Sequence, residues 1–242
     1  MECRFEKNIR IPLSWCDNRG GMSVNSIFTL FMDMAAEHAE DIELGAEKMA
    51  ERGMFWLTAK TKIHINRRPK MMETATAATW PEAPGRIRCN RFYELYTGET
   101  VLAEGITEWA IIDVNTGKLC RASDIYMQGT CFSEKKANVG PFEKIPEDFS
   151  GGEILGTYRI RSTDIDLGQH MNNAAYVRAM MGALSCAELE NTNVTDAEVV
   201  FKTPCYEGNE LTIYRRPTEN GFDIGMLLHD GRTAAAARFK TK

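Results

Sequence analysis

The sequence predicts an α+β protein of two similar halves, each with one long central helix wrapped by a curved antiparallel sheet. Three observations lead to this. The chain of 242 residues is long enough for two domains. Each half opens with a short strand candidate, a turn and a helix that is apolar over much of its circumference. Strand-like runs separated by turn signals follow each helix. Because such a helix requires burial on most sides, a sheet that curls around it is the expected partner.

In the first half, residues 9–15 are the strand candidate, and the Asp-Asn-Arg-Gly-Gly sequence at 17–21 is typical of a turn. Ser23 is a suitable N-cap for the helix that follows, because its hydroxyl can accept a hydrogen bond from a first-turn N–H. The apolar positions of this helix are Val24, Ile27, Phe28, Phe31, Met34 and Ala35. The strand-like runs after it cover residues 55–65, 74–80, 86–96 and 101–114.

The second half repeats this order. Residues 158–161 lead into a turn at 164–168, and Asn172 or Asn173 can cap the next helix. The apolar positions of that helix are Tyr176, Val177, Met180, Met181 and Leu184. The later strand-like runs are 197–202, 210–215, 222–229 and 233–240, the last two joined by a tight turn. Asp17 aligns with Asp166 at an offset of 149 residues, and other pairs keep this offset, which indicates weak internal similarity.

The stretch between the halves is the least regular part of the chain. It holds Pro141, Pro146 and a Gly151-Gly152 pair among Ser, Asn, Lys and Glu, without helical or strand periodicity. It is longer than an ordinary loop, which favours a connection between two folded units. We therefore predict an N-terminal domain at residues 1–127, a linker at 128–152 and a C-terminal domain at 153–242.

Composition excludes several classes of protein. The formal net charge of -5 argues against nucleic acid as the main partner, because phosphate binding favours a basic surface. No window approaches the roughly 18–20 apolar residues of a membrane span, and the N-terminus lacks the apolar core of a signal peptide. The seven cysteines include no Cys-x-x-Cys pair, which fits reduced thiols better than a disulfide framework or a zinc site. We predict a cytoplasmic protein with no metal.

The segment from Asp166 to Tyr176 is the most informative one for chemistry. It places a carboxylate, an imidazole and two amides on a turn that leads into a helix N-terminus. Free N–H groups there suit a developing oxyanion. Thioester hydrolysis needs a positioned water, a proton acceptor and donors for the carbonyl oxygen, while a thiolate of pKa about 8.5 leaves without strong acid assistance. Turn and cap formation alone is an alternative explanation of these residue types.

The sequence from Arg161 to Tyr176 resembles the signature of the acyl-acyl-carrier-protein (acyl-ACP) thioesterases, a D-x-N-x-H-x-N-N-x-x-Y motif that opens the second helix. First-half segments at 56–70 and 109–118 are also similar to this family, so the resemblance spans nearly the whole chain apart from the linker. It implies a tandem (double) hotdog fold. It also implies hydrolysis of fatty acyl-ACP to free fatty acid and acyl carrier protein, ending fatty acid synthesis, with no metal or organic cofactor.

By this resemblance, the catalytic residues are Asp166 and His170. Gly168 stands where the family usually has Asn, and Pro204 stands where it often has an acidic residue before a Cys. Two polar members of the usual site are therefore missing. We expect Gly168, Asn172 or backbone N–H groups to hold the carbonyl oxygen or to position the other groups.

Two further residues follow Pro204. Cys205 is expected to be adjacent to the site rather than a nucleophile, because no base lies near it in the sequence. Glu207 is either a replacement for the missing acid or a solvated turn residue before Gly208. Gly21 stands at the place equivalent to His170, so the first half is expected to lack a catalytic histidine and to wall the acyl tunnel.

Basic residues of the first half are candidates for docking the carrier protein, because acyl carrier proteins are strongly acidic. A solvated strand edge, on which Lys and Arg prevent aggregation, is the alternative. These residues are Arg67, Arg68 and Lys70, and then Arg86, Arg88 and Arg91.

Rival functions remain at this stage. An acyl-CoA thioesterase would use the same chemistry with another carrier, and a non-catalytic acyl-binding protein would tolerate the changes at Gly168 and Pro204. A hydroxyacyl dehydratase is disfavoured because its His-Phe-Pro segment is missing, and a serine hydrolase because Asn25 breaks the Gly-x-Ser-x-Gly motif. The sequence does not determine the acyl length, nor whether the protein is a monomer or a homodimer.

Overall fold

The computed structural model describes residues 3–126 and 129–242. The chain divides into two compact units, Met1–Cys16 with Gly20–Val139 and Asp17–Arg19 with Gly140–Lys242. The predicted domain boundary between residues 127 and 128 lies outside the described residues. The two units are called the N-terminal and C-terminal units below.

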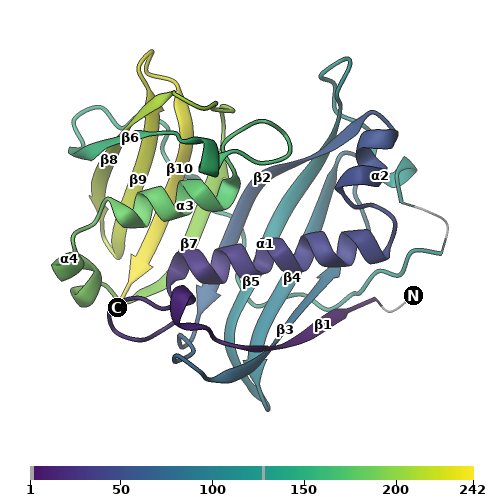
Figure 1. The fold of residues 1–242 in the computed structure, drawn as a ribbon, viewed down its shortest axis with the longest axis horizontal. Helices are drawn as coiled ribbons and strands as arrows, with labels where there is room; N and C mark the ends of the chain where they lie inside the picture. The colour runs from purple at the N-terminus through teal and green to yellow at the C-terminus, as the bar shows by residue number, and fades with distance from the viewer. Residues whose placement is uncertain (1–2, 127–128) are drawn as a thin grey trace. The chain divides into compact units, whose positions relative to one another are not determined.

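The N-terminal unit is an antiparallel sheet with a long helix, α1, along it (Figure 1). The strand order is β1-β3-β4-β5-β2, and each neighbouring pair is antiparallel. The strands of this unit are β1 (Phe5–Arg10), β2 (Met54–Ile65), β3 (Thr74–Pro81), β4 (Arg88–Thr97) and β5 (Thr100–Asp113). Its helices are α1 (Val24–Asp41) and α2 (Ala46–Glu51), with short 3-10 turns at Leu13–Trp15 and Ala122–Asp124.

Helix α1 begins and packs as its sequence predicts. Ser23 is the N-cap, and its side chain accepts a hydrogen bond from the Ser26 N–H. Phe31, on the buried face, stacks on Tyr93 with 4.9 Å between ring centroids. Gly105 on β5 permits this approach, because a Cβ there would lie 2.9 Å from the Phe31 ring. The helix is therefore seated directly on strands β4 and β5.

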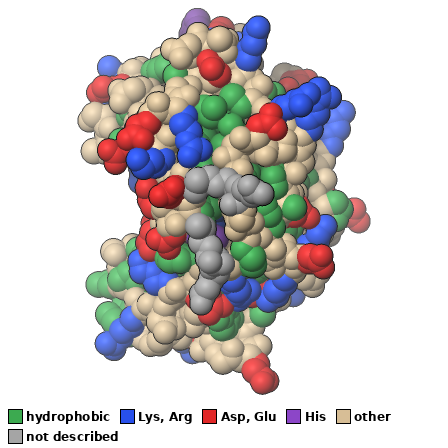
Figure 2. All heavy atoms as spheres, turned by 90° about the vertical axis from the view of Figure 1, so that its right-hand side faces the viewer, with side chains coloured by type: hydrophobic (Ala, Val, Ile, Leu, Met, Phe, Trp, Pro, Cys, Tyr) green, Lys and Arg blue, Asp and Glu red, His purple; other side chains and the backbone are tan. Residues whose placement is uncertain are grey.

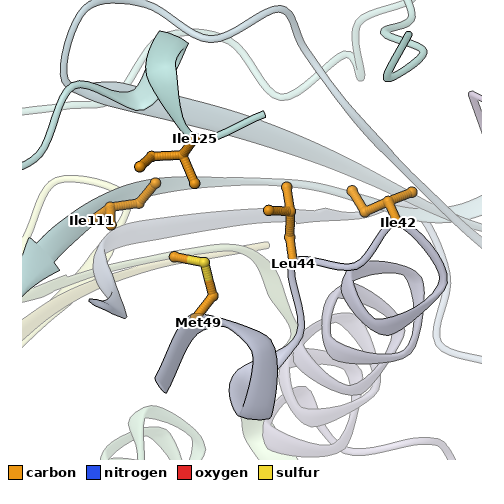
Figure 3. Packing of buried hydrophobic residues seen from close by; sticks show 5 residues of the cluster. All are labelled: Ile42, Leu44, Met49, Ile111 and Ile125. Carbon is orange, nitrogen blue, oxygen red and sulfur yellow. The ribbon is translucent and has the colours of Figure 1, made fainter. Parts of the chain in front are cut away.

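A hydrophobic cluster closes the unit beyond the end of α1 (Figure 3). Leu44 lies in the connection to α2, and Met49 lies on α2 itself. They pack with Ile111 of β5 and with Ile125, which follows the second 3-10 turn. The short helix α2 is thus fixed by burial of one methionine rather than by its own length, since isolated helices this short are unstable.

The C-terminal unit repeats the arrangement with α3 along its sheet (Figure 1). The strand order is β7-β10-β9-β8-β6, again antiparallel at each pair. The strands are β6 (Glu153–Arg159), β7 (Val194–Phe201), β8 (Glu210–Thr218), β9 (Gly221–Leu228) and β10 (Thr233–Thr241). The helices are α3 (Asn173–Gly182) and α4 (Cys186–Asn191), with a 3-10 turn at Ser162–Asp164. The sequence did not predict α4, which starts with a capping box of Ser185 and Glu188.

The internal similarity at an offset of 149 residues has a structural counterpart in the start of each unit. Equivalent backbone N–H groups donate to equivalent places, each over 2.8 Å. In the N-terminal unit, the Met22 N–H donates to the Pro69 carbonyl and the Ser23 N–H to the Trp15 carbonyl. In the C-terminal unit, the Met171 N–H donates to the Cys205 carbonyl and the Asn172 N–H to the Asp164 carbonyl. The same local fold therefore precedes α1 and α3.

The stretch predicted as a linker packs against both sheets rather than running free. In the N-terminal unit, the Trp80 indole N–H donates to the Lys135 carbonyl over 2.6 Å, and Val139 joins the Trp80 cluster. In the C-terminal unit, Phe149 is fully buried, and its ring occupies the space that a side chain at Gly225 would need. Ala137, Val139, Ile145 and Phe149 of this stretch are therefore buried in the cores, while its Pro141, Pro146 and Gly151 are exposed.

Cys3 and Cys131 form a disulfide, with their Cα atoms 4.7 Å apart. The prediction that the cysteines are all reduced thiols is therefore wrong for this pair. The two residues are 128 positions apart, and only the fold brings them together. Within the described residues, no helix is long and apolar enough to cross a membrane.

Candidate active site

A closed turn in the C-terminal unit brings Asp166 and His170 together. The Asp166 N–H donates to the His170 carbonyl over 2.9 Å, and the Gln169 N–H donates to the Asp166 carbonyl over 3.0 Å. Ile165 and Met171 form an isolated antiparallel bridge on either side. Gln169 adopts a left-handed conformation with φ 60°, which reverses the chain. The turn therefore fixes the two predicted catalytic residues as backbone neighbours.

The Asp166 carboxylate is held by its own turn. Its Oδ1 accepts a hydrogen bond of 2.8 Å from the Gly168 N–H. No hydrogen bond joins this carboxylate to the His170 imidazole in the part of the chain that the structure describes. The Gly168 N–H is thus already engaged, and its role as an oxyanion donor stays a prediction that requires this bond to open.

His170 lies against an aromatic residue that the sequence did not point to. Its ring is 5.1 Å from the Tyr206 ring, centroid to centroid, with the planes tilted by 46°. Tyr206 is 51% exposed, and His170 is partly buried. The imidazole is therefore restricted on one side and accessible on the other, as a group that exchanges protons with water must be. The only sequence signal for Tyr206 is its position next to Cys205.

Helix α3 starts three residues after His170. Asn172 is the N-cap, and its Oδ1 accepts from the Ala174 N–H over 2.8 Å, which settles the choice between Asn172 and Asn173. The Ala175 N–H donates to the Asn172 carbonyl. Among the described residues, the Asn173 N–H has no acceptor. One peptide donor at the positive end of the helix is therefore available close to His170.

Asp164 stabilises the turn and the start of α3 through its carboxylate. Its carboxylate is 2% exposed and accepts from the Tyr158 hydroxyl and the Arg161 N–H, both at 2.9 Å. Arg178 of α3 donates to it over 2.6 Å. Its carbonyl also accepts the Asn172 N–H. Asp164 therefore joins β6, the turn and α3, whereas the sequence analysis predicted only turn formation for it.

Cys205 is fully buried beside the turn. Its carbonyl accepts the Met171 N–H over 2.8 Å, and its thiol lies 3.5 Å from the Thr203 carbonyl oxygen. Burial raises the pKa of the Cys205 thiol. Tyr176 hydrogen-bonds with Cys205, and burial raises the pKa of the Tyr176 hydroxyl. The thiol therefore stays protonated at neutral pH, which makes it a poor nucleophile.

Glu207 lies in the turn after Cys205 and is exposed. The next residue, Gly208, adopts φ 84°, and its N–H donates to the Ile160 carbonyl. Within the described residues, the Glu207 side chain has no hydrogen bond or ion pair. This is the geometry expected of a solvated turn residue, the second of the two predictions for Glu207.

The first group of predicted docking residues, Arg67, Arg68 and Lys70, is partly neutralised by a carboxylate. The Arg67 guanidinium donates to both oxygens of Glu73, over 2.6 and 2.9 Å. Arg67 is the main reason that the pKa of Glu73 falls to about 2, with a further bond from the Lys70 N–H. Arg68 is partly buried beside Gly21, the residue equivalent to His170. Only Lys70 of this group is an exposed cation without a carboxylate within hydrogen-bond distance among the described residues.

The second group of predicted docking residues, Arg86, Arg88 and Arg91, does not lie wholly on the surface. Arg88 pairs with Glu108, while Arg86 is exposed and has no side-chain partner in the described chain. Arg91 is 7% exposed and hydrogen-bonds to His38, so the prediction that Arg91 belongs to a surface patch is wrong. Alternation along β4 explains this, because Arg91 points to the face that α1 covers. Figure 2 accordingly shows acidic and basic side chains mixed on the surface that it draws.

Two family models match the chain in order. The acyl-ACP thioesterase N-terminal domain matches residues 2–129, and the acyl-ACP thioesterase C-terminal domain matches residues 152–241. The chain is 23% identical over 219 residues to oleoyl-acyl carrier protein thioesterase 2 of Arabidopsis thaliana, covering 81% of this chain and 59% of that protein. It is 25% identical over 234 residues to the oleoyl-acyl carrier protein thioesterase of Coriandrum sativum, covering 89% and 63%. The chain thus spans about half to two thirds of the length of such relatives.

Solved structures with the same fold cover nearly the whole chain. An acyl-ACP thioesterase from Bacteroides thetaiotaomicron superposes with a TM-score of 0.86 at 16% identity, over 99% of this chain and 98% of that one. The 12:0-ACP thioesterase from Umbellularia californica gives a TM-score of 0.84 at 16% identity, over 100% and 98%. At these identities the likeness establishes the fold, a double hotdog. Since both family models match in order and together span most of its length, the chain belongs to the acyl-ACP thioesterase family.

Proposed function

We propose that this protein hydrolyses fatty acyl-ACP thioesters to free fatty acid and acyl carrier protein, and so ends fatty acid synthesis. The observation that carries the proposal is the closed turn that holds Asp166 and His170 at the start of α3, in a chain of this family. The N-terminal unit has Gly21 at the equivalent place. Its proposed role is therefore to bind the acyl chain and not to catalyse.

In the proposed reaction, His170 accepts a proton from a water molecule that attacks the thioester carbonyl. Asp166 stabilises the imidazolium that forms, through the carboxylate oxygen that Gly168 does not bind. The negative charge on the carbonyl oxygen is stabilised by the Asn173 N–H and the Asn172 side-chain amide. The thiolate of the carrier then leaves without strong acid assistance, because its conjugate acid has a pKa of about 8.5.

The test measures release of free thiol from acyl-ACP and from acyl-CoA of the same chain length, with purified protein. His170→Ala should lower kcat by about 10²–10⁴-fold, which is the usual contribution of proton transfer by a positioned side chain. The matched control is His229→Ala, since His229 is exposed in the turn between β9 and β10. Circular dichroism should show the same fold for both variants.

Each other outcome has a definite meaning. Normal turnover by a folded His170→Ala would contradict the assigned site. Hydrolysis of acyl-CoA alone would identify an acyl-CoA thioesterase. Acyl-ACP binding without hydrolysis would identify a non-catalytic acyl-binding protein, a result consistent with the departures from the family motif at Gly168 and Pro204.

A further inference from the structure

After its last strand, the N-terminal unit continues as an irregular segment on the outer face of its own sheet, the face opposite α1. Side chains alternate along β4, so Phe92 points away from the face on which Tyr93 meets α1. Residues 131–139, called the strap below, lie against this outer face, because Val139 packs in one hydrophobic cluster with Trp80 and Phe92. The strap has no helix or strand of its own, so only its contacts with the sheet hold it in place.

Noncovalent contacts fix the strap near its start. The Ser133 N–H donates to the Pro81 carbonyl over 3.2 Å. The Lys135 carbonyl accepts the Trp80 indole N–H over 2.6 Å, and the Lys135 ammonium lies 2.6 Å from the Glu94 carboxylate. The Glu94 side chain is only 7% exposed, so this ion pair is partly protected from solvent.

The residue next to Cys3 reaches the same place on the sheet. The Arg4 guanidinium donates to Glu94 over 2.8 Å and lies 4.5 Å from the centroid of the Trp80 ring. Cys3 and Cys131 are joined at this point, just before β1 and at the start of the strap. The disulfide therefore links two segments that are each also held by Glu94 and Trp80.

The disulfide is open to thiol exchange. Both of its cysteines are partly exposed, so an external thiolate can reach a sulfur atom. The other five cysteines of the chain are free thiols, so the bond is not part of a disulfide framework. An accessible single pair in a chain of otherwise free thiols is typical of a labile disulfide.

The strap also carries an aromatic contact beside the disulfide. Phe132 follows Cys131, and its ring meets the Tyr126 ring edge to face with 5.1 Å between centroids. Tyr126 in turn packs on Trp56 at 6.3 Å and covers the hydrophobic cluster of Leu44 and its neighbours. The order of the strap at Cys131 is therefore coupled by direct contacts to the end of the unit that this cluster closes.

We propose that the Cys3–Cys131 disulfide is a redox-sensitive clasp, which fixes the strap to the start of β1 when oxidised and releases both when reduced by a dithiol. A thiolate of the dithiol attacks one sulfur atom, the S–S bond breaks, and a mixed disulfide forms. The second thiol of the reductant then displaces the cysteine. The dithiol leaves as its own disulfide, and the protein has gained two electrons and two protons as two thiols.

Reduction should loosen the unit without unfolding it. The contacts of Glu94 and Trp80 remain, so the sheet and the strap keep their noncovalent attachment. The lost bond closes a loop of 128 positions, which covers nearly the whole N-terminal unit. Its loss therefore increases the conformational freedom of the unfolded chain and lowers the stability of this unit.

The test compares oxidised full-length protein with the same protein treated with dithiothreitol. Alkylation after unfolding, read by mass spectrometry, should find five free thiols before treatment and seven after. Dithiothreitol should lower the unfolding temperature by at least about 5 °C. Hydrogen exchange should rise in β1 and at residues 131–135, while the central strand β5 stays protected. Reoxidation with glutathione disulfide should restore the original unfolding temperature.

Cysteine variants separate the clasp from a general effect of the reductant. Cys3→Ser and Cys131→Ser should each match the reduced wild type and should not respond to dithiothreitol. Cys186→Ser is the matched control, since Cys186 is an exposed free thiol, and it should respond as the wild type does. Seven free thiols after oxidation, a bond that dithiothreitol leaves intact in the folded protein, or equal unfolding temperatures of the two forms would each overturn the proposal. None of these measurements depends on thioester hydrolysis.

Discussion

Cys205 illustrates at the scale of one residue how burial controls reactivity. Its thiol is fully buried, its pKa is raised by that burial, and its neighbours are the Thr203 carbonyl and the Tyr176 hydroxyl. Neither neighbour is a base that could accept the thiol proton at neutral pH, because the pKa of Tyr176 is also raised. A nucleophilic cysteine requires the opposite environment, with a lowered pKa and an adjacent base. Water is therefore the expected nucleophile.

Cys205→Ala should accordingly keep most of the activity and lose only about 1 kcal/mol of stability from altered packing. Hydrolysis of acyl-ACP by the variant and its thermal unfolding are the measurements. Mass spectrometry of acid-quenched wild-type protein should find no acyl adduct. An adduct on Cys205, together with an inactive Cys205→Ala, would show that the thiol is the nucleophile after all.

The turn before α3 is the element on which the proposed site depends. Its two ends are joined by the bridge between Ile165 and Met171, and Asp164 ties it to the neighbouring elements. In the N-terminal unit Trp15 is equivalent to Asp164 and makes the same backbone bond through its carbonyl. The backbone arrangement is thus common to both units, while the buried carboxylate is specific to the unit with the histidine.

Asp164→Ala should lower the free energy of unfolding by about 1–3 kcal/mol, because it leaves two part-buried donors, the Tyr158 hydroxyl and the Arg161 N–H, without their acceptor. The contribution of Arg178 is smaller, since its side chain is 57% exposed. Urea denaturation measures the loss, and kcat should fall because the turn that carries His170 is no longer braced. Asp148→Ala, at an exposed carboxylate that accepts from the Ser150 N–H of its own turn, is the control and should change stability little. A loss below about 0.5 kcal/mol for Asp164→Ala would mean that the turn is stable without this brace.

At the scale of the whole molecule, the distribution of charge bears on carrier binding. The net charge is -5, so an acidic carrier must find a local basic area. Arg67 and Arg88 already pair with carboxylates, which reduces the field that they present. Lys70 and Arg86 are the exposed cations of the predicted patch that remain.

The double variant Lys70→Glu with Arg86→Glu should raise KM for acyl-ACP, while hydrolysis of a small acyl-pantetheine thioester should change little. Steady-state kinetics at low and high salt is the measurement, and salt should reduce the difference between variant and wild type by screening. Lys144→Glu with Lys242→Glu, at two exposed lysines of the C-terminal unit, changes the net charge by the same amount and is the control. Equal losses on both substrates would indicate structural damage and would contradict docking at this patch.

Much of the fold could be predicted from the sequence because its signals are local. Strand-like runs bounded by turn signals placed β2 and β5 within one residue of their observed ends, and Ser23 and Asn172 cap helices as their side chains allow. The motif from Asp166 to His170 was recognisable for the same reason. It is a turn and a cap, whose geometry depends on residues within a few positions of one another.

The tertiary structure decided what depends on residues far apart in the sequence. Alternation along β4 puts Arg91 on one face of the strand, but only the packing of α1 makes that face the buried one. Likewise, the Cys3–Cys131 disulfide and the burial of Phe149 against Gly225 depend on long-range register. Sequence alone therefore predicted the two long helices, most of the strands, the family resemblance and the candidate catalytic pair, but not the short helices α2 and α4. Which side chains are buried, paired or accessible was decided by the fold, because burial is a property of the whole packed chain.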